Sequence, residues 1–319
     1  MHALRGLTAV AWAAFDPDWY LASYPTVRSA IEDESPEAIL YFYLQQGRRL
    51  GHSPNMFFDE AWYLRTYSDA TAAIRRGDAA SGFDHYCRVG FADHSPHWLF
   101  DEANYRRNYP QLSDGALQAA DFVNGYDHYL RHGARENRVA HWLFDPNVYR
   151  AHLEFEAAKE AEAVGPFRHY LDQIAAGEPE PRTTLYFDPG WYLQHYQEVA
   201  GAVSANRWQS ALHHYLTNDT PTVFDPLPEF SESYYLDRDG DAAAAVAAGA
   251  QRNGYQHFLE RGRLVTQSPS AELDLAYYVR LPTVRADLRR PRAGRFYALP
   301  GDRQGAGAAA GATARGAGQ

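Results

Sequence analysis

The chain repeats one aromatic-rich motif at a nearly constant spacing, and this periodicity limits the fold more than any other feature. The motif reads FDPDWYL at Phe15 and FDEAWYL at Phe58, and it recurs at Phe100, Phe144, Phe187, Phe230 and Leu273. The steps between these starts are 43, 42, 44, 43, 43 and 43 residues. A second motif, such as DHYLRHG, follows the first by about 27 residues in six copies. Such self-similarity is typical of architectures in which each repeat packs on its neighbours.

Each copy of the first motif reads as the start of a helix. An Asp follows the Phe and stands where an N-cap carboxylate would accept hydrogen bonds from free backbone N–H groups. Pro17, Pro146 and Pro189 come next in three copies, at a position where a missing N–H costs nothing. The preceding Phe can act as a hydrophobic staple. The predicted cap residues are Asp16, Asp59, Asp101, Asp145 and Asp188.

Two further helices are predicted in each repeat. An Ala-rich segment such as DATAAIRRG has high helix propensity and ends at a glycine, as at Gly77 and Gly249. The HYL segment then begins after a Ser or Asn cap and ends at a glycine, for which we expect a left-handed backbone. These glycines are Gly47, Gly90, Gly133 and Gly262. We therefore predict an all-α fold, an α-solenoid of about seven repeats, each of two short helices and one longer helix.

The period also sets the predicted domain limits. Residues 15–288 form the helical array, an N-terminal cap segment at 1–14 precedes it, and an Ala-, Gly- and Arg-rich tail follows at 289–319. The tail abandons helical patterning, so we expect it to be disordered. A shift of reading frame near Arg289 would produce such a tail. As an alternative to a cap, the N-terminal segment resembles a weak signal-peptide core.

Composition favours a folded protein with neutral or cationic partners. Hydrophobic residues make up 45% of the 319 residues, enough to form a core. The net charge of −10 argues against a nucleic-acid partner, because phosphate binding relies on basic patches. No apolar stretch reaches the roughly 20 residues that a membrane span needs. A single cysteine, Cys87, excludes a multi-cysteine metal site, and it stands where other copies carry Leu, so we expect it to be buried.

The repeat also places the histidines. His85 shares its position with His128, His169, His214 and His257. Packed helices lie about 8–10 Å apart, so successive copies are too distant to share a metal ion, and we expect these side chains to bond between helices or to be exposed. His94 and His97 could meet at a surface metal, but two ligands without a carboxylate make a weak site. We predict no catalytic residue, no cofactor and no metal site.

Aromatic residues and loops offer other candidate sites. Trp19, Trp62 and Trp191 could form an aromatic platform for a sugar, although aromatic residues at fixed repeat positions usually form the core. Pro-rich interruptions at 177–186 and 217–230 should protrude as loops that bend the array or contact a partner.

Two motifs carry a resemblance to known repeats. FDPxWYLxxY at Phe187 to Tyr196 and GYxHYLxxGxxE at Gly125 to Glu136 resemble a repeat of large bacterial glycosyltransferases of cell-surface polysaccharide synthesis. A similar unit, with AAVAAG ahead of GYQHF, resembles repeats of large secreted haemolysin-type calcium-binding proteins of alphaproteobacteria. The resemblance covers about Phe15 to Leu299. It implies an accessory array beside a functional domain, and this chain carries neither a catalytic glycosyltransferase domain nor a Gly-Asp-rich calcium-binding nonapeptide.

We therefore expect a non-catalytic helical-repeat scaffold or interaction module, linked by resemblance to glycosyltransferases of surface polysaccharide biosynthesis. The alternatives are a truncated N-terminal part of a glycosyltransferase and a surface protein associated with glycan or calcium. The expected partner is another protein or a covalently linked glycosyltransferase domain, with a glycan as the alternative ligand. We expect a cytoplasmic location, with secretion or the cell surface as alternatives. An enzyme would need a convergent, non-repeated cluster of polar residues, and the sequence reveals none.

Overall fold

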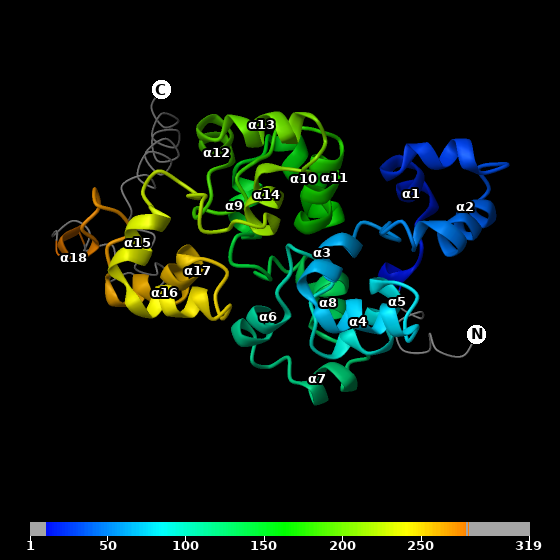
Figure 1. Ribbon diagram of the computed structural model, residues 1–319, viewed down its shortest axis with the longest axis horizontal. Coiled ribbons are helices and arrows are strands. Elements are labelled where there is room, and N and C mark those ends of the chain that lie inside the picture. Colours follow the sequence, from blue (N-terminus) through cyan, green and yellow to red (C-terminus); the bar gives the residue numbers. More distant parts are fainter. Residues whose placement is uncertain (1–10, 279, 281–319) are drawn as a thin grey trace, which may run out of the picture. The chain divides into compact units, whose positions relative to one another are not determined.

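The structure, a computed structural model, describes residues 11–278 and 280, and this part of the chain consists of helices joined by turns and loops (Figure 1). No strand occurs among these residues. The predicted all-α class is therefore confirmed. The predicted tail at 289–319 and residues 1–10 of the predicted N-terminal cap lie outside the described residues.

Three helical segments follow one another in each of the first six predicted repeats. The first segments are α1 (Pro17–Ser23), α3 (Glu60–Thr66), α6 (Glu102–Asn108), α9 (Pro146–Ala151), α12 (Pro189–His195) and α15 (Glu232–Arg238). The second segments are a 3-10 helix (Pro25–Ala30), α4 (Ser68–Arg76), α7 (Asp114–Ala119), α10 (Phe155–Val164), α13 (Gln197–Ser204) and α16 (Gly240–Ala247). The third segments are α2 (Pro36–Phe42), α5 (Gly82–Arg88), α8 (Gly125–His128), α11 (Pro166–Ala175), α14 (Ala211–Thr217) and α17 (Gly254–Glu260). In the seventh copy, α18 (Leu275–Tyr278) is described.

The third segment is not consistently the longest, so this part of the prediction is wrong. α2 and α8 continue into π-helical turns at Tyr43–Gly47 and Tyr129–Gly133. By contrast, α5 has 7 residues and the preceding α4 has 9. α5 ends because the next residue, Val89, leaves the helical region with a φ of −139°.

The predicted cap residues accept hydrogen bonds from the first turn of the helix that follows. Asp59 Oδ1 accepts from the backbone N–H of Trp62 at 2.8 Å, and Asp16, Asp101 and Asp188 make the same bond at 2.8 to 3.0 Å. Asp145 accepts from Asn147 at 2.9 Å. Each bond satisfies a donor that a helix N-terminus leaves free, which is why Asp follows the Phe in five copies.

Each cap residue also donates its own backbone N–H to a carbonyl oxygen 37–39 residues later in the chain, at 2.7 to 3.2 Å. The donors are Asp16, Asp59, Asp101, Asp145, Asp188 and Ser231, and the acceptors are Pro54, Pro96, Ala140, Thr183, Pro226 and Pro269. Every acceptor lies four residues before the next copy of the motif. This bond, the cap–loop bond, ties the start of a repeat to the loop that leads into the next one.

The chain divides into two compact units. Among the described residues, unit 1 contains those up to Thr184 together with Ala202–Thr217, and unit 2 contains Leu185–Gly201 together with those from Asn218 onward. Tyrosine dominates both cores. The largest fully buried side chains of unit 1 are Tyr20, Tyr63, Tyr86, Tyr105, Tyr126, Tyr129, Tyr149, Tyr170 and Tyr215, and those of unit 2 are Tyr192, Tyr235 and Tyr255.

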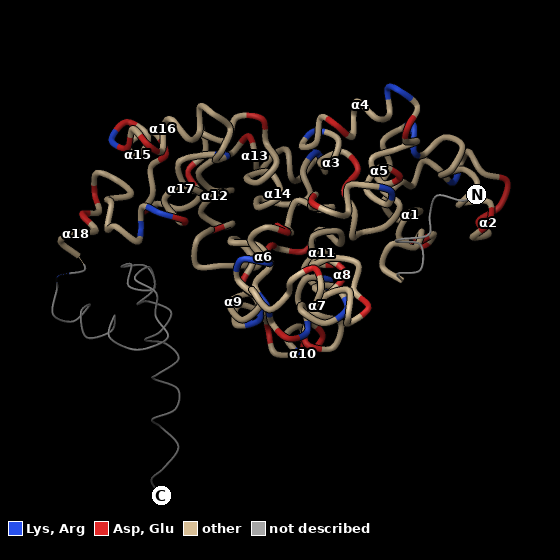
Figure 2. The backbone as a smooth tube through the Cα atoms, turned by 90° about the horizontal axis from the view of Figure 1, so that it is seen from below, with Lys and Arg blue, Asp and Glu red and all other residues tan. Residues whose placement is uncertain are grey.

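Charged residues of both signs are interspersed along the described backbone (Figure 2). Within that part of the chain, no helix is long and apolar enough to cross a membrane.

Candidate functional site

Four of the five histidines at the repeated position each bond to a tyrosine on the first helix of their own repeat. A hydrogen bond of 3.0 Å joins His85 Nδ1 to the Tyr63 hydroxyl. The equivalent pairs are His128–Tyr105 at 2.9 Å, His169–Tyr149 at 2.7 Å and His257–Tyr235 at 3.0 Å. Burial lowers the pKa of His85, His128 and His169, which favours the neutral imidazole. These residues therefore join two helices of a repeat, which is one of the two roles expected from the sequence.

A glutamate next to the cap residue closes the N-terminus of the third helix in three repeats. The Glu60 carboxylate accepts from the backbone N–H groups of Gly82 at 2.5 Å and Phe83 at 2.9 Å. Glu102 does the same for Gly125 and Tyr126, and Glu232 for Gly254 and Tyr255. Burial raises the pKa of Glu60 and of Glu232 to about 7, against the lowering effect of these bonds.

Sequence reasoning missed these glutamates, although the repeats hold a signal for them. Where Glu follows the cap residue, Gly occupies the first position of the third helix. Where Pro146 follows it, that position is Pro166, which has no N–H to donate. In the first repeat, which has Pro17, α2 begins three residues earlier, at Pro36. The two positions thus change together, as expected of a donor and its acceptor.

In the fifth repeat, a glutamate of the first Pro-rich interruption accepts hydrogen bonds from the N–H groups at the start of the third helix. Pro189 follows the cap of this repeat, so no glutamate stands there, although α14 begins with residues that have N–H groups to donate. Glu180 Oε2 accepts from Ala211 N–H at 2.7 Å, and Glu180 Oε1 accepts from the Tyr170 hydroxyl at 2.6 Å. Thr183 is buried and donates its hydroxyl to the Leu143 carbonyl at 2.7 Å. This part of the interruption therefore does not protrude as predicted, whereas residues 219, 220, 222 and 223 of the second interruption are exposed.

The glycines divide into two kinds. Gly77 and Gly249 have φ of +80° and +70°, the left-handed backbone expected at a helix end. Gly47, Gly90, Gly133 and Gly262 lack a positive φ, so that prediction is wrong for them. A Cβ atom at Gly90 would collide with the Tyr63 hydroxyl oxygen, and each of the other three faces a tyrosine hydroxyl in the same way. Close approach of the tyrosine explains the glycine.

His97 is buried, so it cannot join His94 in a surface metal site, for which the sequence offered only a weak case. Its side chain is 3% exposed, and Nδ1 accepts from the Leu99 backbone N–H at 3.1 Å. His141 accepts from Leu143 and His213 accepts from Gln209 in the same way, also at 3.1 Å. Burial lowers the pKa of His97, His141 and His213 to about 3, so all three are neutral.

The aromatic platform residues and Cys87 lie in ordinary packing environments. Trp19, Trp62 and Trp191 are half-buried, and each packs edge-on against the tyrosine five residues later in its own repeat. Their binding of a sugar stays a prediction. Cys87 is buried, as expected, and burial raises the pKa of its thiol to about 12.

The end of the N-terminal segment packs on the second and third repeats. Trp12 contacts the rings of Tyr86 and Tyr126, and its Nε1 donates to Asp127 Oδ1 at 3.1 Å. The Asn55 side chain donates to the carbonyls of Trp12 and Ala14. Residues 11–14 thus contact more than the first repeat that they were expected to cap.

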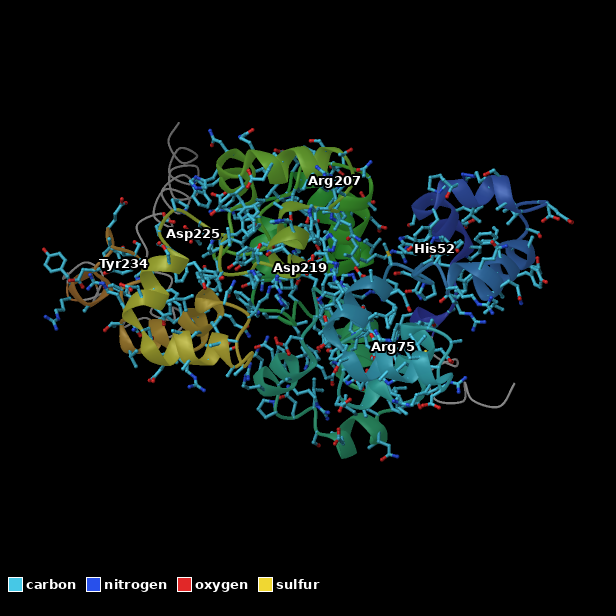
Figure 3. All side chains as sticks on the ribbon, in the orientation of Figure 1. His52, Arg75, Arg207, Asp219, Asp225 and Tyr234 are labelled. Atoms are coloured by element: carbon cyan, nitrogen blue, oxygen red, sulfur yellow. The ribbon has the colours of Figure 1, made fainter. Side chains whose placement is uncertain are left out.

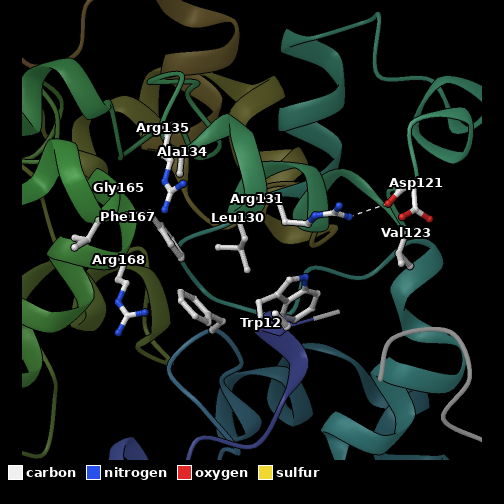
Figure 4. A pocket seen from close by; sticks show the side chains of 13 residues that line it. Trp12, Asp121, Val123, Leu130, Arg131, Ala134, Arg135, Gly165, Phe167 and Arg168 are labelled. Carbon is white, nitrogen blue, oxygen red and sulfur yellow. Dashed lines mark hydrogen bonds between the residues drawn. The ribbon is translucent and has the colours of Figure 1, made fainter. Parts of the chain in front are cut away.

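Trp12 also lines a pocket of about 600 Å³ in unit 1. Phe57, Leu130 and Phe167 contribute apolar surface, and the basic residues are Arg131, Arg135 and Arg168. Figure 4 shows Arg135 and Arg168 on the same side as Phe167, and Arg131 extended toward Asp121. Arg131 donates to the Asp121 carbonyl at 2.8 Å and to Asp127 Oδ2 at 3.3 Å, so it has a structural role as well.

One polar cluster does not follow the repeat. Asp69, His85 and His94 place their potential ligand atoms within 4.8 Å of one another, and among the described residues no other group of three His, Cys, Asp or Glu side chains does so. Sequence reasoning assigned His85 and His94 to two different sets and did not consider Asp69. The structure brings all three together in the second repeat.

Comparisons with known protein families, curated proteins and solved structures find no match to this chain. The resemblance of its repeats to those of glycosyltransferases and calcium-binding proteins therefore stays a prediction.

Proposed function

We propose that the chain is a non-catalytic helical-repeat module that holds partner molecules, and that its repeats stack as an α-solenoid of about seven units. The observation that carries this proposal is the recurrence of the same internal contacts from repeat to repeat. Asp side chains cap helices, histidines bond to tyrosines, and glutamates close the third helix. The repeated groups that an enzyme could use for acid–base chemistry thus hold helices together.

Two recurring bonds support the stacking of neighbouring repeats. The cap–loop bond connects each repeat with the entry to the next one. The Tyr126 hydroxyl of the third repeat donates at 2.7 Å to the carbonyl of Phe57, the residue directly before the second repeat. The Tyr255 hydroxyl of the sixth repeat donates at 2.7 Å to the carbonyl of Tyr186, the residue directly before the fifth repeat. Nearest-neighbour contacts of this kind are what a solenoid requires.

The partner follows from the resemblance of the motifs. Similar repeats accompany glycosyltransferases of surface polysaccharide synthesis, so we propose a glycosyltransferase, encoded nearby or in the same polypeptide, as the molecule that this module holds. The module works as an accessory part and leaves the sugar transfer to its partner.

Scattering and turnover measurements test this proposal. A compact protein of 319 residues has a radius of gyration of about 20 Å, and a solenoid exceeds it clearly in small-angle X-ray scattering. Incubation of the purified chain with nucleotide-sugars and saccharide acceptors should give no transfer. A compact radius refutes the solenoid, and transfer by the chain alone refutes the non-catalytic role.

A second candidate function, binding of an acidic saccharide, is favoured by the pocket of unit 1. Arg131, Arg135 and Arg168 gather there although the chain is acidic overall. Guanidinium groups bind carboxylates in a two-bond geometry, and the apolar wall suits the face of a sugar ring.

Calorimetry with an oligosaccharide of uronic acids tests this second function. The double variant Arg135→Ala/Arg168→Ala should lose binding, while Arg75→Ala, an exposed arginine near the end of α4 (Figure 3), should retain it. A neutral oligosaccharide is the matched ligand control. Equal binding by the two variants rules out the pocket.

A further inference from the structure

We propose that Asp69, His85 and His94 form a binding site for a divalent transition-metal ion, with Zn²⁺ as the fitting example. The three ligands come from different segments: Asp69 from the first turn of α4, His85 from α5, and His94 from the loop after the 3-10 helix Gly90–Ala92. Two imidazoles and a carboxylate are a ligand set that zinc accepts. The inference does not depend on the proposed function.

The spacing of the ligand atoms fits a metal ion. Asp69 Oδ2 lies 3.7 Å from His85 Nε2 and 3.6 Å from His94 Nε2. Zinc takes nitrogen and oxygen ligands at about 2.0–2.2 Å, so two ligands of a tetrahedral site lie about 3.4 Å apart. The two oxygen–nitrogen distances therefore need to contract by only a few tenths of an ångström, and the three ligand atoms all lie within 4.8 Å of one another.

Tyr63 holds both imidazoles in the orientation that coordination needs. Its hydroxyl bonds to Nδ1 of His85 at 3.0 Å and to Nδ1 of His94 at 2.9 Å, so both Nε2 atoms remain directed toward Asp69. A metal-bound histidine usually makes such a second bond through its other ring nitrogen. The tyrosine has one hydroxyl hydrogen, so with neutral rings at least one histidine donates from Nδ1 and has an unprotonated Nε2.

Packing fixes the rings further and leaves the site open. The His94 ring stacks on Tyr67 with a centroid distance of 3.9 Å and an interplanar angle of 3°. The two histidine side chains are 6% and 14% exposed, while Asp69 is 60% exposed. A metal ion can thus enter from the side of Asp69, and a water molecule or the nearby Asp93 carboxylate, 3.6 Å from His94 Nε2, can complete the coordination.

The cluster is not a by-product of repeat packing. The Tyr–His bond recurs, but in the third repeat Arg138 stands where His94 stands, and in the sixth repeat Gln267 does. The first repeat has the counterpart of His94, His52, bonded to Tyr20 at 2.7 Å, but Phe42 replaces the counterpart of His85. Only the second repeat combines the two histidines with an acidic side chain.

The ligand chemistry also separates this site from a calcium site. Calcium takes six to eight oxygen ligands, whereas imidazole nitrogen suits zinc, copper, nickel and cobalt. Binding of Zn²⁺ would tie α4, α5 and the following loop together, so it should stabilise unit 1.

Calorimetric titration of the untagged, metal-free chain with ZnCl₂ tests the site. We expect one Zn²⁺ per chain, bound at micromolar concentration or tighter, and no binding of CaCl₂ under the same conditions. Asp69→Asn and His94→Gln should each weaken binding by tenfold or more. The matched control is His52→Gln, which changes the equivalent histidine of the first repeat (Figure 3) and should bind Zn²⁺ like the wild type.

Cobalt provides a second readout. Co²⁺ at this site should give the visible absorption of a four-coordinate ion, and added Zn²⁺ should remove it. Because Asp69 is exposed, its Asn variant should fold normally, which circular dichroism checks. Absence of zinc binding by the wild type overturns the proposal, as does zinc binding that is unchanged in Asp69→Asn and His94→Gln.

Discussion

Three buried histidines should make unit 1 sensitive to acid, and replacing one of them by Asn should remove its share of that sensitivity. Nδ1 of His97, His141 and His213 accepts a backbone N–H, so protonation there breaks a hydrogen bond and buries a charge. Burial accordingly lowers the pKa of each to about 3. All three belong to unit 1.

The sign of the effect follows from the two pKa values. An unfolded histidine has a pKa of about 6.5, so between pH 6.5 and pH 3 the unfolded chain binds a proton that the folded chain does not. The stability present above pH 6.5 is therefore lost as the pH falls. For one histidine the loss is about 1.4 kcal/mol per pH unit, or about 2 kcal/mol between pH 8 and pH 5.

Glu60 acts in the opposite direction and makes the total pH profile ambiguous. Its folded pKa of about 7 lies above the unfolded value, so its contribution grows as the pH falls from 7 to 4.5 and is lost as the pH rises. The informative quantity is therefore the difference in unfolding free energy between a histidine variant and the wild type.

The chain itself supplies the replacement. Asn55 of the first repeat occupies the position of His97, and its side-chain oxygen accepts the Phe57 N–H at 2.9 Å. His97→Asn should keep the backbone bond and lose the titration. Urea unfolding can be followed by tryptophan fluorescence, because the ring centroid of Trp98 lies 5.1 Å from that of His97. Between pH 8 and pH 5, the unfolding free energy of the variant should rise by about 2 kcal/mol relative to that of the wild type.

The exposed His152, replaced by Asn, is the control and should show no such gain. A difference between His97→Asn and wild type that stays constant over this pH range would refute the reasoning, because it would mean that His97 is not held neutral by the fold.

Three further predictions concern buried groups. Glu102→Ala leaves the N–H groups of Gly125 and Tyr126 without their acceptor and should lower the unfolding free energy by roughly 1–3 kcal/mol, with faster hydrogen exchange of α8; unchanged exchange would contradict it. Gly133→Ala should destabilise the protein, because the added Cβ atom meets the Tyr105 hydroxyl. Gly115→Ala in α7 is the control: no other atom lies near the added Cβ atom, so it should raise the unfolding free energy by about 0.5–1 kcal/mol. Equal effects of the two variants in thermal melts would disprove the steric argument. Cys87, with a thiol pKa of about 12, should resist iodoacetamide at pH 8 and react only in denaturant, as mass spectrometry can show.

Features encoded within a few neighbouring residues were predictable from the sequence. The bonds of the Asp caps and the left-handed glycines at Gly77 and Gly249 depend only on residues close in sequence. The all-α class follows from the same local signals. The length of the third helix could not be predicted from these signals, because it depends on whether the residue after the helix stays in the helical region.

Contacts across 20 or more residues were harder to predict. Glu60 and Gly82 are 22 residues apart, yet their bond could have been found, because Glu and Gly change together among the repeats. No such comparison reveals the cluster of Asp69, His85 and His94, because it occurs once. Glu180 was equally hidden, since a loop of irregular sequence replaces the helix-start position that supplies the carboxylate elsewhere.

The cap–loop bond has a consequence for how such a gene can change. The period varies from 42 to 44 residues, and the sequence separation between the donor and the acceptor of the cap–loop bond varies in step from 37 to 39 residues. All variation in repeat length therefore lies between the two bonded residues. The stretch from the acceptor to the next motif is constant. Duplication or excision of one whole period would give every remaining donor a new acceptor of the same kind. Unequal crossing-over can therefore lengthen or shorten the array in steps of one repeat while each junction keeps its bond.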